Sequence, residues 1–315
     1  NKKNFLFYLT YINEYTFFVM KKKNILLTGS ESFIASFLIK KLEKKYNVIG
    51  IDNIKTRKTT KLILDINSPK ILKLKFKIDY IIHLAALSRD KDCKENPIDC
   101  MKTNILGTLN LIELANKKKI KNFIFASTQW VYNFKSFKEK NESDLIDISK
   151  VKSEYSLSKL VSENNLKQNY ETKNLNTTIL RFGIIYGPRF KNLSAVESIF
   201  YNSIENNKIE VGSLKTARNF IHVYDICSAI VKSLNVKGFN ILNLEGDKLI
   251  DLNKLLDISE KILKKKIIKI EKNKLSRSIR SVSNKKAKRI LNWHPKYDIY
   301  KGLTDLYKFY KKNKT

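Results

Sequence analysis

Short apolar runs alternate with helix-length amphipathic segments between Asn24 and Ile185, and this alternation restricts the fold more than any other feature of the chain. Strands that are apolar throughout are typical of a parallel sheet covered by helices on both faces. The sequence therefore predicts an α/β fold built on a doubly wound parallel sheet, with ligands at the carboxyl ends of the strands. The expected strands are residues 24–28, 47–51, 61–66, 79–85, 122–127 and 176–182, and the expected helices are residues 32–45, 97–119 and 152–169.

The last third of the chain has a more mixed pattern, and no linker separates it from the alternating segment. We therefore expect a smaller mixed α/β C-terminal region, residues 183–315, partly interleaved with a first domain of residues 20–182. Its expected elements are short strands at residues 209–211 and 239–244 and helices at residues 223–234, 251–263 and 299–311.

The composition limits the classes of function. Of the 315 residues 43% are hydrophobic, which is enough for a core, and the formal net charge is +32. The basic residues are spread along the whole chain, which argues against nucleic acid as a partner. Three cysteines without CxxC spacing and three scattered histidines predict no metal site and a reduced, cytoplasmic setting.

The opening segment from Phe5 to Met20 is apolar and aromatic, but Asn13 and Glu14 interrupt it and it is too short for a membrane span. We therefore expect no membrane anchor. The run that begins at Met20 leads directly into the first strand, so residues 1–19 are expected to be a non-native or disordered extension. The alternative interpretation is a peripheral helix that contacts a membrane.

The turn after the first expected strand has some features of a dinucleotide-binding turn. A Rossmann-type fold needs small residues there, because the backbone must approach a pyrophosphate at the N-terminus of the next helix. Gly29 is the one glycine that remains, and Ser32 is small enough to permit contact. Asp52 ends the second strand, where a carboxylate accepts hydrogen bonds from an adenosine ribose and repels a 2′-phosphate. The sequence therefore predicts NAD, rather than NADP, as a cofactor bound by residues 20–182.

Tyr155 and Lys159 are spaced one helical turn apart in an expected helix, so they share a face. An ammonium group close to a phenol lowers the pKa of the phenol towards neutrality, and such a tyrosine can transfer protons. The spacing alone is common in helices. The order of the motifs is more specific, because the pair follows the glycine turn, Asp52 and a strand that ends in Ser127 and Thr128. This order predicts that Tyr155 and Lys159 are a catalytic pair.

Further motifs follow one another in a fixed order over most of the chain. They are Thr28-Gly29-x-x-Ser32-Phe33-Ile34-Ala35, Asp52-Asn53, Asp65-Ile66, His83-Leu84-Ala85-Ala86, Thr103-Asn104-x-x-Gly107-Thr108, Ser127-Thr128-x-x-Val131-Tyr132, Arg181 to Arg189, Arg218 to Val223 and Leu291-Asn292-Trp293-x-Pro295. With these motifs the chain, from about Met20 to Tyr310, resembles the extended short-chain dehydrogenase/reductase family, in particular the NAD-dependent epimerase/dehydratase group that acts on nucleotide sugars.

The resemblance implies a role for each matching residue. Catalysis would depend on Thr128, Tyr155 and Lys159. The cofactor contacts would be Gly29, Ser32, Phe33, Ile34, Asp52, Asn53, Asp65, Ile66, Leu84, Ala85, Ala86, Asn104, Tyr155 and Lys159. The substrate contacts would be Ser88, Thr128, Arg189, Arg218 and Arg280, and guanidinium groups suit a diphosphate.

The resemblance also implies hydride transfer to and from NAD while Tyr155 takes the proton of a sugar hydroxyl. Dehydratases and decarboxylases of the family place an acid directly after the catalytic Ser/Thr, where this chain has Gln129 and Trp130. We therefore favour a nucleotide-sugar epimerase that acts at C4 through a transient keto sugar.

Other interpretations stay open. They are an NAD-dependent nucleotide-sugar dehydrogenase or reductase, and a non-catalytic NAD-binding or RNA-binding relative of the same fold. The resemblance further implies a possible homodimer through the helices at residues 97–119 and 152–169.

Overall fold

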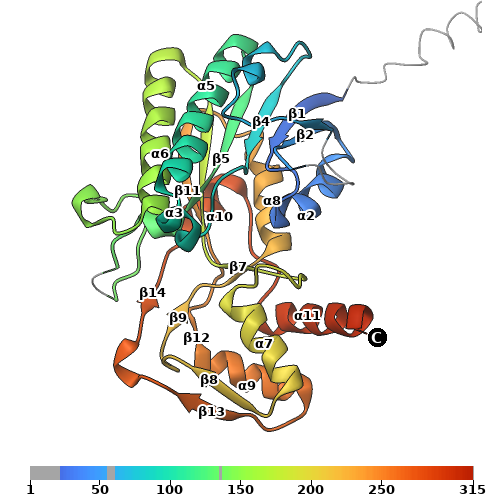
Figure 1. Ribbon diagram of the computed structural model, residues 1–315, viewed down its shortest axis with the longest axis vertical. Helices are drawn as coiled ribbons and strands as arrows, with labels where there is room; N and C mark the ends of the chain where they lie inside the picture. The colour runs from blue at the N-terminus through green and yellow to red at the C-terminus, as the bar shows by residue number, and fades with distance from the viewer. Residues whose placement is uncertain (1–21, 55–60, 135–136, 315) are drawn as a thin grey trace, which may run out of the picture.

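The computed structural model describes residues 22–54, 61–134 and 137–314. A large sheet with helices on both faces forms the upper part of the molecule in Figure 1, and a smaller region of short strands and helices lies below it. The interpretation of residues 1–19 as an extension concerns residues outside those described. No helix in the described ranges is long and apolar enough to cross a membrane. In the same ranges there is no group of His, Cys, Asp and Glu side chains that could hold a metal ion.

Seven strands of the described chain form the central sheet, all parallel, in the order β3-β2-β1-β4-β5-β6-β11. This order reverses direction at β1, which is the defining feature of a doubly wound sheet. The predicted Rossmann-type fold is confirmed. The strands are β1 (Lys23–Thr28), β2 (Tyr46–Asp52), β3 (Leu62–Ile63), β4 (Tyr80–His83), β5 (Asn122–Thr128), β6 (Thr177–Phe182) and β11 (Phe239–Leu244).

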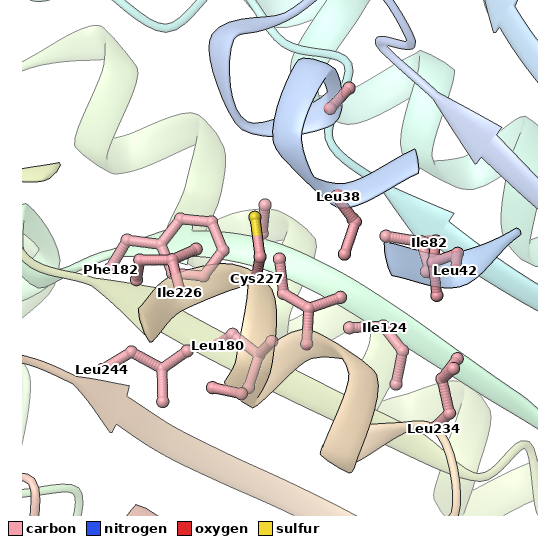
Figure 2. Packing of buried hydrophobic residues seen from close by; sticks show 14 of the residues in the cluster. Leu38, Leu42, Ile82, Ile124, Leu180, Phe182, Ile226, Cys227, Leu234 and Leu244 are labelled. Atoms are coloured by element: carbon pink, nitrogen blue, oxygen red, sulfur yellow. The ribbon is translucent and has the colours of Figure 1, made fainter. Parts of the chain in front are cut away.

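Helices cover both faces of this sheet. On one face lie α2 (Phe33–Leu42), α8 (Val223–Ser233) and α10 (Lys285–Leu291), and Figure 2 shows Leu38 of α2 and Ile226 of α8 close to the strand residues Ile82, Ile124 and Leu180. On the other face lie α5 (Gly107–Lys118) and α6 (Glu154–Lys173). Both faces of β5 and β6 are covered, which explains why every residue of these two strands is buried.

The smaller region has its own apolar core, to which α7, α9 and α11 contribute. Its short strands make three small sheets, β10-β7, β12-β9-β14 and β13-β8. Its elements are β7 (Ile185–Tyr186), α7 (Ala195–Glu205), β8 (Lys208–Val211), β9 (Ala217–Arg218), β10 (Ile221–His222), β12 (Ile250–Asp251), α9 (Leu252–Leu263), β13 (Ile268–Glu271), β14 (Ile279–Arg280) and α11 (Ile299–Lys314).

Two expected elements differ from the structure. The strand expected at residues 61–66 is reduced to β3, an edge strand whose Ile63 is exposed. The helix expected at residues 97–119 is interrupted: α4 (Pro97–Met101) passes through a π-helical turn, η2 (Lys102–Leu106), into α5, and a separate helix α3 (Asp90–Glu95) precedes it. Such turns often occur at functional sites because they redirect a side chain. Beyond residue 182, β11, α8 and α10 pack on the central sheet.

Candidate active site

Two adjoining cavities follow the carboxyl edge of the central sheet, where β1, β2, β4 and β5 end. The outer cavity has a volume of about 490 Å³ and the inner cavity about 460 Å³. Both are lined by Ser32, Leu84, Ala86, Ser88 and Arg89. The two cavities therefore form one continuous groove that an extended ligand could occupy at the position typical of this fold.

The turn between β1 and α2 forms one wall of the outer cavity, and Gly29 and Ser32 determine its shape. Gly29 has a φ angle of +68°, and a Cβ atom there would lie 2.7 Å from the backbone nitrogen of Ala85, so glycine alone fits. Ser32 is the N-cap of α2, and its Oγ accepts a hydrogen bond of 3.3 Å from the N–H of Ala35. The close approach of the backbone and the helix N-terminus together suit a pyrophosphate.

Asp52 lies at the other side of the outer cavity, at the end of β2. Its carboxylate accepts hydrogen bonds from the backbone N–H groups of Glu31 at 3.0 Å and Ile54 at 3.3 Å, which fix its position. A fixed carboxylate here can accept hydrogen bonds from a ribose, so the outer cavity fits the adenosine half of NAD. The predicted residues that line it are Gly29, Ser32, Asp52, Asn53, Asp65, Ile66, Leu84, Ala85 and Ala86, while Phe33 and Ile34 line the inner cavity.

Asn104 was expected to contact the cofactor, but in the described structure it lines neither cavity. Its side-chain oxygen accepts from the Leu87 N–H at 2.9 Å, and its side-chain NH₂ donates to the Leu87 carbonyl at 3.0 Å and to Ser158 Oγ at 2.9 Å. The π-helical turn η2 places Asn104 where it can make these bonds. Asn104 therefore ties the segment after β4 to α6, and its contact with the cofactor stays a prediction.

The inner cavity brings together the three predicted catalytic residues, Thr128, Tyr155 and Lys159. Thr128 ends β5, and its Oγ1 accepts a hydrogen bond of 3.2 Å from the Trp130 N–H, which leaves the hydroxyl proton available to another acceptor. Ser153 caps α6 by accepting from the Ser156 N–H at 3.1 Å, so Tyr155 lies in the first turn of that helix. One turn later, Lys159 Nζ donates to a carbonyl of β5.

The electrostatics of the pair differ from the sequence expectation. Lys159 Nζ donates a hydrogen bond of 2.8 Å to the Ala126 carbonyl. The same nitrogen lies 4.7 Å from the centroid of the Phe125 ring. Burial raises the pKa of Tyr155 above its usual 10, although a hydrogen bond from Thr128 offsets part of this effect. Burial also lowers the pKa of Lys159 from its usual 10.5 to about 8. The expected fall of the Tyr155 pKa is thus not found in the protein alone, because desolvation by burial is the largest effect on the phenol.

A buried polar network that the sequence interpretation missed supports the end of β5. Glu163 of α6 accepts from Ser127 Oγ at 2.5 Å and from Arg181 at 3.0 and 2.6 Å. Arg181 of β6 also donates to the Tyr132 hydroxyl at 2.9 Å, and that hydroxyl donates to Asn243 of β11 at 2.9 Å. The network joins the three neighbouring strands β5, β6 and β11 to α6 directly beside Thr128. The available signal was spacing, since Glu163 follows Lys159 by the same helical turn that separates Lys159 from Tyr155.

The predicted substrate arginines lie in two places. Arg189 lines the inner cavity, where it pairs with Glu197 at 2.7 Å and lies 4.1 Å from the Phe33 ring centroid. Arg218 and Arg280 stand opposite each other in register on β9 and β14, outside the inner cavity. Burial and the charge of Arg280 lower the pKa of Arg218 to about 10, and burial lowers that of Arg280. Two half-buried cations this close together favour an anionic ligand.

The comparisons with known proteins point in one direction. The sequence profile of the family described as "NAD dependent epimerase/dehydratase family" matches residues 25–244. The chain is 28% identical to a UDP-glucuronate 4-epimerase from Thermodesulfobacterium geofontis, over 91% of this chain and 96% of that protein. It is 31% identical to a UDP-N-acetyl-alpha-D-glucosaminuronate decarboxylase from Bacillus cytotoxicus, over 77% of this chain and 83% of that protein.

Similarity to solved structures covers nearly the whole chain. The crystal structure of a UDP-glucose 4-epimerase from Thermotoga maritima with UDP-glucose aligns with a TM-score of 0.81 and 26% identity. The alignment covers 93% of this chain and all of that one.

Proposed function

This chain belongs to the NAD-dependent epimerase/dehydratase family, and we propose that it is a UDP-sugar epimerase that inverts the configuration at C4. The observation that carries this proposal is the convergence of Thr128, Tyr155 and Lys159 on one cavity at the end of a dinucleotide-shaped groove. The similarity to UDP-sugar 4-epimerases over more than nine-tenths of the chain supports the choice of substrate class.

The groove residues would hold NAD along the carboxyl edge of the sheet, with the turn at Gly29 against the pyrophosphate and Asp52 at the adenosine ribose. When bound, oxidised NAD supplies the hydride acceptor and a positive charge that lowers the pKa of a nearby phenol. The narrow approach of Gly29 to Ala85 and the fixed Asp52 carboxylate are the features that support this assignment.

In this proposal Tyr155 is the proton acceptor and donor at the C4 hydroxyl. Thr128 donates a hydrogen bond to the same oxygen as it becomes a ketone, because the Trp130 N–H already occupies one lone pair of its hydroxyl. Lys159, held by the Ala126 carbonyl, keeps a positive charge next to the reacting groups at neutral pH. Rotation of the keto sugar within the cavity would then present its other face.

A decarboxylase among the relatives makes loss of CO₂ the competing reaction. The residues after Thr128 argue against it. Trp130 lines the inner cavity and carries no acidic group, and Gln129 is buried and is an amide rather than a carboxylic acid. Neither side chain can move a proton at the carbon next to C4, whereas epimerisation requires no such group.

The test is incubation of the purified protein and NAD with UDP-, GDP- and dTDP-sugars, followed by NMR of the sugar. We expect inversion at C4 of a UDP-sugar, seen as a change in the H3–H4 coupling. Release of water or CO₂, or a net change in NADH without inversion, would replace the proposal with a dehydratase, a decarboxylase or a dehydrogenase.

The Lys159→Met variant should be inactive but more stable at neutral pH. Lowering the pKa from 10.5 to about 8 means that the charged, buried ammonium destabilises the folded state by roughly 3 kcal/mol below pH 8. Loss of the bond to Ala126 offsets about 1 kcal/mol of this. In thermal unfolding, we expect the midpoint to rise at pH 7, and the gain to shrink as the pH rises from 8 and to disappear above 10.5, where lysine is neutral in both states. A lower midpoint at pH 7 would contradict this interpretation.

A further inference from the structure

Arg89 lies where the two cavities of the groove meet. It follows β4, directly before α3, and lines both the outer and the inner cavity. Its Nη1 donates a hydrogen bond of 3.2 Å to the side-chain oxygen of Asn192, which also lines the outer cavity. Asn192 belongs to the segment between β7 and α7 in the smaller region, and both residues are exposed. The bond therefore links the edge of the central sheet to the smaller region on the solvent side of the cavity.

The backbone of Asn192 has an unusual conformation. Its φ angle is +52°, in the left-handed region that side chains other than glycine rarely adopt and that asparagine tolerates best. Residues in such sparsely populated conformations are concentrated at active sites and ligand clamps. Here the conformation places the side-chain amide of Asn192 within hydrogen-bond reach of Arg89.

A second bond fixes the guanidinium of Arg89. Its Nε donates to Asp92 at 2.7 Å, and the Arg89 side chain in this ion pair is 63% exposed. An exposed pair of this kind is weak, so the side chain can move aside when a ligand enters. Two of the five N–H groups of the guanidinium are used in these bonds, and the other three have no partner within the described residues.

The outer cavity is lined by one cation, Arg89, in the part of the chain that the structure describes. The other charged residues in its wall are all acids, namely Glu31, Asp52, Asp65 and Asp92. NAD carries a negatively charged pyrophosphate, which these carboxylates repel. A guanidinium with free N–H groups can offset this repulsion, because it offers both positive charge and paired hydrogen bonds to phosphate oxygens.

We propose that Arg89 and Asn192 form a clasp over the pyrophosphate of NAD. The free N–H groups of Arg89 bind the pyrophosphate, and the bond to Asn192 holds the guanidinium over the cofactor and slows its release. The inference rests on the proposed function, which supplies the position of NAD in the groove. The clasp acts on retention of the cofactor and takes no part in the proton transfer at Tyr155.

The test measures release of the cofactor without any sugar. NADH is bound to the protein, an excess of NAD is added, and the fall in bound NADH fluorescence gives the dissociation rate. The Arg89→Gln variant should release NADH about tenfold faster than the wild type, because charge-assisted hydrogen bonds to phosphate are lost. In calorimetric titration it should bind ADP-ribose about tenfold more weakly, and adenosine as the wild type does, since adenosine has no pyrophosphate.

The Asn192→Gly variant tests the bond between the two residues. Glycine adopts the left-handed conformation freely, so the variant removes the amide and keeps the course of the backbone. We expect release of NADH about fivefold faster than in the wild type, the effect of one lost hydrogen bond. The double variant of Arg89→Gln and Asn192→Gly should release NADH no faster than Arg89→Gln alone, because both changes break the same bond. A release rate of Asn192→Gly equal to that of the wild type would overturn the clasp.

Lys91→Gln is the matched control. Lys91 is exposed on α3, pairs with Glu95 at 3.6 Å and lines neither cavity, so its loss should leave the release rate unchanged. Release of NADH by Arg89→Gln at the rate of Lys91→Gln, or an equal loss of affinity for adenosine and ADP-ribose, would overturn the clasp while leaving the epimerase function standing. Failure of the wild-type protein to bind NADH and ADP-ribose would overturn the clasp together with the placement of the cofactor.

Discussion

The Tyr155→Phe variant should lose epimerase activity, with kcat reduced about 1,000-fold or more, because it removes the phenol that we propose as acceptor of the C4 hydroxyl proton. Binding of NAD and UDP-sugar should stay close to that of the wild type. Within the described residues, the phenol oxygen interacts with Thr128 of the same cavity, so its removal should leave the fold intact. The measurement is kcat by NMR or a coupled assay, together with calorimetric affinities for NAD and UDP-glucose.

Tyr170→Phe is the matched control for this experiment. Tyr170 lies on the same helix, α6, and packs against the Phe239 ring far from the inner cavity. It should keep full activity. Substantial turnover by Tyr155→Phe, or a loss of cofactor affinity equal to the loss of kcat, would remove Tyr155 from the role of proton acceptor.

The Glu163→Gln variant should be the most destabilised of the single variants considered, by about 3–5 kcal/mol in the free energy of unfolding. Glu163 and Arg181 are almost completely buried, and the variant leaves the Arg181 charge without its counter-ion. The Ser127 hydroxyl also loses its charged acceptor beside Thr128. Urea unfolding followed by circular dichroism gives the free energy directly.

Glu171→Gln provides the comparison on the same helix. Glu171 pairs with Lys167 at 3.7 Å with both side chains more than half exposed, and such surface pairs contribute at most about 1 kcal/mol. If Glu163→Gln unfolds with the same free energy as Glu171→Gln, the buried network does not stabilise the end of β5 in the way we describe.

The central sheet could be predicted because burial on both faces leaves a direct mark in the sequence. Every residue of β5 and β6 is buried, so each strand is apolar enough to be recognised from its residues alone. The π-helical turn η2 could not be predicted, because residues 97–119 carry a helical pattern throughout and the interruption depends on the bonds of Asn104 with Leu87. The pairing of β11 with β6 depends on contacts distant in sequence.

The candidate site, like the fold, could be predicted from the sequence only in part. Motifs predicted Gly29, Asp52, Thr128, Tyr155 and Lys159, each at a strand end or on one helical face, and all five line the two cavities. The tuning of the tyrosine was not predicted, because the pKa of a buried phenol depends on desolvation, which spacing does not reveal.

The hydrogen at C4 can be followed through the proposed reaction by isotope labelling. A UDP-sugar labelled with deuterium at C4 is converted by the protein and NAD in ordinary water, and the product is examined by NMR and mass spectrometry. We expect the deuterium to be retained at C4 of the inverted product, because the hydrogen removed from that carbon is returned to it within one cavity. Inversion with replacement of the deuterium by solvent hydrogen would contradict it.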